Sequence, residues 1–284
     1  MVTHFKTLLI AVLFLNLAMS VFSFQPSGGV LSLDGVDDYA VLRFEEHGYL
    51  FPKNTREFTV EMWFYPKSEP TNHGERNIIF RQQVYFGLTN HATCKGDVSK
   101  LCCYGGAYLD GEKVHGVTGF RVSMERNKWN YVAILYKDGT IGWAYNNWIY
   151  KSGSTAPMDR VTTKDLGKLK DFFVGGYDRE MVRVIRFHGD IDAIRFSRIA
   201  RYDLPDIPGV KEPFQPPHRF STDRDTVALW NFDEREGTTR FQDEAKNERI
   251  LIGMNGASIG SALDVNPDST SLTTTWGQIK ARSR

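Results

Sequence analysis

The hydrophobic positions along the chain recur with the two-residue period of β-strands. In residues 58–65 (FTVEMWFY) the even positions carry Phe, Val, Met and Phe, and residues 129–136 (WNYVAILY) are apolar on both faces. The second pattern indicates a central strand of a sandwich. Short runs at 172–176 and 187–196 continue the series between turn residues, and no helical period exceeds about two turns. We therefore predict an all-β chain folded as a two-sheet antiparallel jelly-roll β-sandwich.

Turn residues divide the middle of the chain into a hairpin and a third strand. Lys137-Asp138-Gly139 follows the run at 129–136 directly and precedes residues 140–145 (TIGWAY). A strand, an Asp-Gly turn and a second strand strongly predict a hairpin. Asn146-Asn147 marks the next turn, before a third strand that starts at Trp148.

A proline-rich segment interrupts the strand pattern late in the chain. Residues 203–218 (DLPDIPGVKEPFQPPH) contain five prolines, too many for regular structure, and the segment is long enough to cross a surface as a strap. A strand pattern resumes at residues 226–232 (TVALWNF). About 40 residues after the strap bury too little core to fold separately. We therefore predict one domain over residues 24–260 and a flexible, disordered tail over 261–284, which is Ser/Thr-rich and ends in a basic stretch.

The N-terminal residues have the features of an export signal. Lys6 precedes an apolar run of 11 residues from Leu8 to Ala18, and small residues suited to cleavage follow at Ser20 and Ser23. A membrane anchor is the alternative, but a spanning helix needs about 20 apolar residues. We expect a signal peptide over residues 1–23, no membrane span, and a secreted, extracellular or cell-envelope location.

Charge is balanced along the chain. Its 35 basic and 34 acidic residues give a net charge of +1, without a basic patch. Nucleic-acid binders carry such a patch. We therefore expect no nucleic-acid partner.

Three cysteines lie close together, at Cys94, Cys102 and Cys103. Export permits disulfides, and an odd number leaves one thiol over. We predict a local disulfide from Cys94 to Cys102, with Cys103 as the alternative partner. Three free thiols and a zinc site with His91 are further alternatives, although the spacing fits no standard zinc motif well.

Aromatic residues are concentrated in the hairpin at residues 142–150 (GWAYNNWIY). Trp143 and Tyr145 have the same parity and face one way, and Trp148 follows two asparagines. Such rings stack on sugars or anchor a protein partner, although strands normally use one aromatic set to fill the core. Our predicted ligand-binding residues are Trp143, Tyr145 and Trp148, with Tyr104 on a second rim.

An acidic turn, Asp34-Gly35-Val36-Asp37-Asp38, offers three carboxylates within five residues. Calcium takes six to eight oxygen ligands. Asp190 and Asp192 would approach this turn if the first and last strands of the sandwich pair. The predicted metal ligands are therefore Asp34, Asp37, Asp38, Asp190 and Asp192. In the alternative interpretation, Asp34 and Asp37 form Asx-turns that cap backbone amides, and Asp192 is a buried hydrogen-bonding acid.

Five segments in order resemble the laminin G-like jelly rolls of the concanavalin A-like lectin/glucanase superfamily. They are residues 31–39 (LSLDGVDDY), 58–66 (FTVEMWFYP), 129–139 (WNYVAILYKDG), 173–176 (FVGG) and 187–196 (FHGDIDAIRF). Residues 228–237 (ALWNFDEREG) resemble a strand that commonly precedes the first of these segments, but here it comes last. Because chain ends of a compact domain lie close together, the strand can fill the same place. The resemblance also implies a structural calcium, which many members hold.

Members of this superfamily include glycosidases, which makes catalysis the first alternative to binding. Retaining hydrolysis needs two carboxyls about 5 Å apart. The comparable pattern here, Asp190-Ile191-Asp192, lacks a third acid, and Glu61 stands alone on its strand. We therefore expect no enzyme and no catalytic residue, but a recognition or adhesion module for a glycan or an extracellular protein. A purely structural envelope or matrix component is the third possibility.

Overall fold

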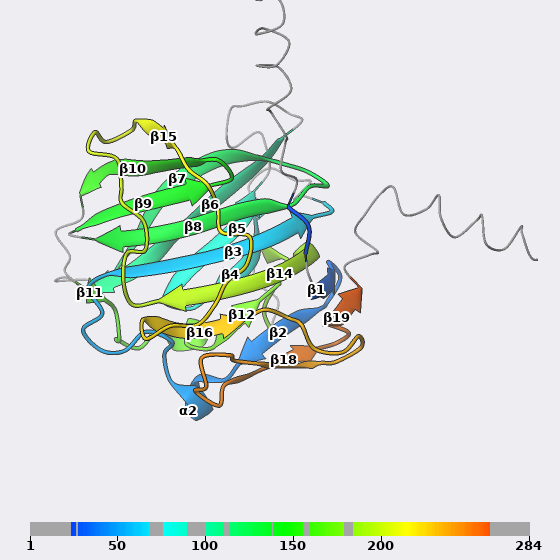
Figure 1. The fold of residues 1–284 in the computed structure, drawn as a ribbon. Helices are drawn as coiled ribbons and strands as arrows, with labels where there is room; N and C mark the ends of the chain where they lie inside the picture. Colours follow the sequence, from blue (N-terminus) through cyan, green and yellow to red (C-terminus); the bar gives the residue numbers. More distant parts are fainter. Residues whose placement is uncertain are drawn as a thin grey trace, which may run out of the picture.

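Two antiparallel β-sheets packed face to face form the body of the protein (Figure 1). The computed structural model describes residues 24–26, 28–68, 76–89, 100–110, 114–137, 139–155, 160–178 and 184–261. The predicted all-β, two-sheet sandwich is confirmed. The predicted signal peptide lies outside the described residues, as does the predicted tail apart from Ser261.

Sheet A contains nine strands. In spatial order they are β15 (Lys211–Pro213), β10 (Trp148–Thr155), β9 (Thr140–Tyr145), β8 (Asn130–Lys137), β3 (Phe58–Pro66), β14 (His188–Ser197), β1 (Gly29–Asp34) and β19 (Ser258–Ser261), with β16 (Thr226–Trp230) paired to β14. Both predicted turns of the aromatic segment are present, since Lys137 pairs with Thr140 and Tyr145 pairs with Trp148.

Sheet B contains ten strands. In spatial order they are β11 (Arg160–Val161), β6 (Lys100–Asp110), β5 (Val84–Thr89), β4 (Arg76–Arg81), β12 (Phe172–Val174), β2 (Tyr39–Leu42), β18 (Ile250–Met254) and β17 (Arg240–Gln242), with β7 (Val114–Glu125) paired to β6 and β13 (Val184–Ile185) parallel to β4. Two short helical segments join strands, α2 (Phe44–His47) and the three-ten turn η2 (Gly167–Leu169). In the described part of the chain, no helix is long and apolar enough to cross a membrane.

The main core lies between the sheets, where large aromatic rings from both sides meet. Phe172 of sheet B stacks on Trp230 of sheet A at 5.6 Å between ring centroids, and its edge contacts Phe196 at 5.3 Å. Such rings bury 150–250 Å² each and dominate core energetics. This core fixes which face of each strand points inward.

Strand β8 has the central position that its two apolar faces predict. It pairs with β3 on one side and β9 on the other. Val132 and Ile134 point into the main core, whereas Tyr131 and Leu135 belong to a separate cluster on the outer face of sheet A. The outer face of this sheet is therefore also covered.

The covering is supplied by the proline-rich strap and by the start of the described chain. The segment that carries β15 runs across the front of sheet A in Figure 1. Its Phe214 stacks on Tyr131 at 5.6 Å, and the Nε1 of Trp63 donates a hydrogen bond of 2.9 Å to the carbonyl of Pro217. Phe24 stacks flat on Trp63 at 3.8 Å. Chain segments distant in sequence thus close this face.

The strands that follow the strap join the same two sheets. β16 pairs with the second half of β14, and β1 pairs with the first half. The late strand therefore lies in line with β1, beside the closing strand of the sandwich.

Candidate functional site

The structure separates the four aromatic residues predicted to bind a ligand. Trp143 is fully buried in the main core, and a Cβ atom added at Gly105 of sheet B would lie 2.6 Å from its ring. Tyr145 is buried in the same core, and Tyr104 is buried in a cluster on the outer face of sheet B. The prediction that these three side chains present a binding surface is therefore corrected, because they fill the protein instead. Trp148 has 44% of its surface exposed.

Trp148 lies near the edge of sheet A, on the strand next to the edge strand β15 and just after the turn between β9 and β10. It is paired with Tyr145 on one side and with Pro213 of β15 on the other. The amide of Phe214 donates a 2.8 Å hydrogen bond to the carbonyl of Asn147 and fixes the turn against the strap. The ammonium of Lys211 lies 5.3 Å from the centre of the Tyr145 ring. The indole is therefore held on a braced edge with polar groups beside it.

The position of Trp148 on the inner face of its strand follows from the two-residue period. It has the same parity as Tyr150, whose ring contacts Tyr145 in the core. The core ends beyond β10, since β15 is a three-residue edge strand with exposed side chains. The period thus predicts the shared face correctly, but exposure depends on where the sheet ends.

The cysteines are partly outside the described residues. Cys103 is a free, fully buried thiol, and burial raises its pKa. Cys102 is buried but is not free. Cys94 lies outside the described residues. The Cys94–Cys102 disulfide therefore stays a prediction, with Cys103 excluded as a paired residue.

The acidic turn brings three of the five predicted metal ligands together. One carboxylate oxygen each from Asp34, Asp37 and Asp38 lies within 4.8 Å of the others. Asp34 and Asp37 are exposed, whereas Asp38 is buried. Burial raises the pKa of Asp38, the amide of Asp34 opposes this with a hydrogen bond, and the charges of Asp34 and Asp37 raise it further. Among the described residues no ion pair involves these three carboxylates.

The turn is also held by the capping bonds expected of aspartates. The amide of Val36 donates a 2.7 Å hydrogen bond to Asp34 Oδ1, and the amide of Asp34 donates one of 3.1 Å to Asp38 Oδ2. The first of these is an Asx-turn. Capping uses part of the lone pairs of these oxygens and leaves others facing solvent. The two interpretations of the turn are therefore compatible in this geometry.

The structure places Asp190 and Asp192 away from the acidic turn. The first and last strands pair as expected, with Ser32 opposite Asp190. The carboxylate of Asp190 instead accepts a 2.5 Å hydrogen bond from Ser32 and forms an ion pair of 2.9 Å with Lys67. Within the described part of the chain, the three-carboxylate group does not include these two residues.

Asp192 occupies an irregularity in the pairing between β14 and β3. Burial, followed by the nearby charge of Asp233, raises the pKa of Asp192 to about 7, and Arg219 partly opposes the shift. The guanidinium of Arg219 is paired with Asp233, so it offsets only part of the rise in the pKa of Asp192. Asp192 therefore changes charge near neutral pH.

This pKa predicts a pH-dependent stability. An unfolded aspartate titrates near 3.9, so the folded state binds more protons between about pH 4 and pH 7, and stability falls as pH rises through that range. Asp192→Asn should raise the melting temperature by about 2–5 °C at pH 8 and leave it nearly unchanged at pH 4. Asp206→Asn, at an exposed strap position, is the matched control. If the melting temperatures of Asp192→Asn and the wild type differed by the same amount at pH 8 and at pH 4, burial of the charged Asp192 would not destabilise the fold.

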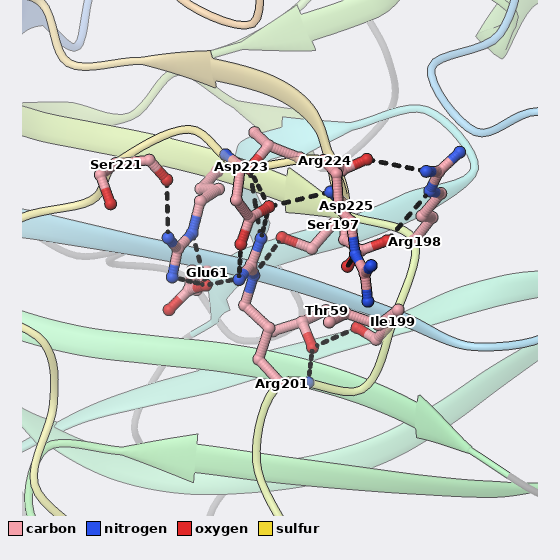
Figure 2. A network of polar contacts seen from close by, with 12 residues as sticks. Thr59, Glu61, Ser197, Arg198, Ile199, Arg201, Ser221, Asp223, Arg224 and Asp225 are labelled. Carbon is pink, nitrogen blue, oxygen red and sulfur yellow. Dashed lines mark hydrogen bonds and ion pairs between the residues drawn. The ribbon is translucent and has the colours of Figure 1, made fainter.

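A network of polar contacts lies on the outer face of sheet A, around Glu61 (Figure 2). Arg195 lies directly opposite Glu61 in the sheet, and its Nη2 is 2.7 Å from Glu61 Oε1. The hydroxyls of Tyr131 and Tyr202 each donate a 2.7 Å hydrogen bond to Oε2. The Glu61 side chain has no solvent-exposed surface. Burial, followed by the charge of Glu61, raises the pKa of Tyr131 and of Tyr202.

A second arginine extends the network to the base of the strap. Arg201 binds Asp223 through two contacts of 2.8 Å and lies 3.9 Å from Glu61. This guanidinium lowers the pKa of Asp223 far below its usual value. Sequence analysis did not identify this network. The available signal was an acid and an arginine in the middle of apolar strands, where buried charges need partners.

The network explains what Glu61 can and cannot do chemically. Both carboxylate oxygens accept charged or hydroxyl donors from the protein itself. A retaining glycosidase needs two carboxyls about 5 Å apart with access to the substrate. Glu61 is covered by the strap and forms an ion pair with Arg195, so the geometry favours a structural role for this acid.

No protein-family model matches the chain, and no curated protein matches it in sequence. In structure it is similar to a Bacteroides ovatus protein whose proposed function is carbohydrate binding, with a TM-score of 0.51 and 16% identity over 84% of this chain and 60% of that protein. The chain therefore spans less than two thirds of the length of that protein. Two further similar structures are domains LG4–5 of the mouse laminin α1 chain (TM-score 0.36, 12% identity, 69% and 49% coverage) and the CBM40 module of the Ruminococcus gnavus IT-sialidase (0.40, 17%, 64% and 95%). The first likeness shows a shared β-sandwich fold.

Proposed function

We propose that the protein is an exported carbohydrate-binding module without catalytic activity, and that the sugar stacks on Trp148. The exposed indole on a braced sheet edge is the observation that carries this proposal. A flat aromatic face joined to polar neighbours suits a sugar ring, which has an apolar face and a hydroxyl rim. The exposed Asn147 precedes Trp148 in the chain, and the exposed Lys211 lies on the adjacent strand β15 with its ammonium over the Tyr145 ring.

Two further observations support the proposal. The N-terminal sequence has the pattern of an export signal. The Bacteroides ovatus protein that shares the fold has carbohydrate binding as its own proposed function. Two acids on the outer face of sheet A are almost completely buried, and each is paired with a basic residue. Arg195 neutralises Glu61, and Lys67 neutralises Asp190. This favours binding over hydrolysis.

The proposal is tested with a glycan array probed by the fluorescently labelled mature chain, which begins at residue 24. We expect a restricted set of glycans to retain the protein, with release by the free sugar. The Trp148→Ala variant should lose this retention because it removes the stacking surface. An array on which the wild type and the variant behave alike would refute the assignment of the site.

We also propose that the acidic turn binds a structural calcium ion. Asp34, Asp37 and Asp38 would hold it, since their oxygens lie within 4.8 Å of one another and Asp38 carries a raised pKa. The charges of Asp34 and Asp37 contribute to that raised pKa after burial, and a divalent cation would offset the repulsion among the three carboxylates. Asp190 is left out of the proposed ligand set because its carboxylate contacts Ser32 and Lys67, and Asp192 because it does not belong to the group of close carboxylates.

Calcium should therefore stabilise the folded chain. Extracellular calcium sites have Kd values of about 10⁻⁴–10⁻³ M, so about 10 mM calcium should raise the melting temperature by about 3–10 °C relative to chelator. Asp37→Asn should abolish the rise, because it removes one of the three proposed carboxylate ligands. The Asp37 carboxylate is exposed and takes no part in the two capping hydrogen bonds of the turn, so the substitution should leave the turn itself intact. Asp206→Asn should retain it. An identical melting temperature with calcium and with chelator would return all three aspartates to a capping role.

A further inference from the structure

The neighbours of β14 change at the middle of the strand. On one edge, β14 pairs along most of its length with β3. On the other edge, β1 pairs with its first half as far as Ile191, and β16 pairs with its second half from Ile194 onward. The register gives Asp192 no partner in any of these three described strands. Sheet A therefore has a junction at Asp192, where β16 ends and β1 begins.

Three segments distant in sequence meet at this junction. Asp233 follows the end of β16, and Gly28 precedes the start of β1. A Cβ atom added at Gly28 would lie 1.8 Å from Asp233 Oδ1, so the chain start packs directly on that carboxylate. The third segment is the strap loop, which comprises residues 198–225 between β14 and β16. Its Arg219 forms the ion pair with Asp233.

One guanidinium serves two carboxylates at the junction. Arg219 is paired with Asp233, and within the described part of the chain the carboxylate of Asp192 has neither an ion pair nor a hydrogen bond of its own. An ionised Asp192 therefore leaves an excess of negative charge among the three groups.

The other charged groups around the junction do not remove this excess. Those of the neighbouring strands and of the segment after β16 already have partners, namely the pairs Lys67–Asp190 and Arg195–Glu61, and Glu234 with the amide of Gln242. Two more titratable groups belong to the covering segments. They are the exposed imidazole of His218 and the α-amine that removal of the signal peptide would leave on Phe24. The test below separates both from Asp192.

The carboxylate of Asp192 has different surroundings in a closed and in an open junction. In the closed junction, burial followed by the charge of Asp233 raises the pKa of Asp192 to about 7. In an open junction, water would solvate the carboxylate, which would then titrate near 3.9 like an ordinary aspartate. The open form binds fewer protons than the closed form between about pH 4 and pH 7, so a rising pH favours opening in that range and has no further effect above it.

We propose that Asp192, Asp233 and Arg219 form a pH-sensitive latch, which holds the returning end of the strap loop and the chain start on sheet A while Asp192 is protonated and loosens both when it ionises. The ionised carboxylate repels Asp233 and competes with it for the one guanidinium. Separation of the segments relieves both effects, because water then solvates the charges.

The root of the strap loop should stay closed when the latch opens. Arg201 binds Asp223 there, and the amide of Arg198 donates a 2.9 Å hydrogen bond to the carbonyl of Asp225 (Figure 2). These contacts lie outside the group of three charges. Opening at the latch is therefore expected to be local.

Trp63 contacts both of the segments that the latch holds. The Phe24 ring stacks flat on it at 3.8 Å, and its Nε1 donates a hydrogen bond to the carbonyl of Pro217, two residues before Arg219. Its indole proton should exchange with solvent when Pro217 withdraws. Trp143 is fully buried in the main core, so its indole proton should exchange when the two sheets separate.

The test follows the exchange of the Trp63 indole proton by NMR of the mature chain, which begins at residue 24 and carries isotope-labelled tryptophan. Rates measured from pH 5 to pH 8 are divided by those of the urea-unfolded chain, which removes the intrinsic pH dependence of exchange. We expect the corrected rate to rise at least tenfold between about pH 5 and pH 7 and to level off above about pH 7. Trp143 should exchange more slowly than Trp63 at every pH.

Three variants identify the group that titrates. Asp192→Asn should hold the corrected rate at its low-pH level throughout, because the latch no longer ionises. Asp233→Asn should flatten the rise, because Arg219 then neutralises Asp192, and this variant serves if the first fails to fold. Asp206→Asn, at an exposed strap position, should keep the wild-type profile.

Three results would overturn the latch. The first is a corrected Trp63 rate in the wild type that does not change with pH. The second is a rise that persists in the folded Asp192→Asn variant, which would assign the titration to His218 or to the α-amine. The third is equal exchange of Trp63 and Trp143, which would mean that the whole fold opens instead of the strap loop and the chain start.

Discussion

Replacing Arg195 with methionine should lower the free energy of unfolding by about 3–5 kcal/mol, measured by urea denaturation. The substitution leaves the carboxylate of Glu61 buried, with two tyrosine hydroxyls and a more distant Arg201 as its partners. An uncompensated buried charge is far more costly than a surface one. The same substitution removes the contacts of Arg195 with the Phe220 ring and the Ser221 carbonyl, so the strap loop should loosen as well.

The double variant Glu61→Leu with Arg195→Met is the control for this prediction. Replacing both members of a buried ion pair with apolar groups of similar size is often neutral or stabilising. We therefore expect the double variant to recover most of the stability that the single variant loses. A loss below about 1 kcal/mol for Arg195→Met would mean that water or Arg201 compensates Glu61.

Trp143→Ala should be destabilising by a similar amount, about 3–5 kcal/mol, whereas Trp148→Ala should cost less, about 1–2 kcal/mol. Trp143 is fully buried between the sheets, where its ring packs close to Gly105, and its removal would leave a cavity that the surrounding strands cannot fill. Trp148 is 44% exposed, so its truncation removes less buried surface than the truncation of Trp143. Urea denaturation of both variants measures the difference. Similar losses for the two would contradict the assignment of one tryptophan to the core and the other to the surface.

Local patterns in the sequence predicted part of the strands, among them β3, β8, β12, β14 and β16, and the hairpin of the aromatic segment. The two-residue period identified β3 and β8, and the Asp-Gly and Asn-Asn turns separated β8, β9 and β10. The period also placed Trp143 and Tyr145 on one face. It did not indicate whether that face is inside, because this depends on the second sheet, which is assembled from residues far along the chain.

The remaining features depend on long-range register. Glu61 and Arg195 are 134 positions apart, and no local pattern reveals that they lie opposite each other. The expected approach of Asp190 to the acidic turn failed for a related reason. The strands do pair, but Lys67, which follows the end of β3, forms an ion pair with Asp190 instead. A sequence gives the types of residue that need partners more readily than the partners themselves.

The proposed carbohydrate site depends on Trp148. Its most direct test is a calorimetric titration of the glycan selected on the array into the wild type, Trp148→Ala and Trp148→Phe. We predict binding at least tenfold weaker for Trp148→Ala, partial recovery for Trp148→Phe, which retains an aromatic face, and a cooperative unfolding transition for both variants; a tenfold change corresponds to about 1.4 kcal/mol. Equal affinity for all three proteins would contradict the account and place the sugar elsewhere on the molecule.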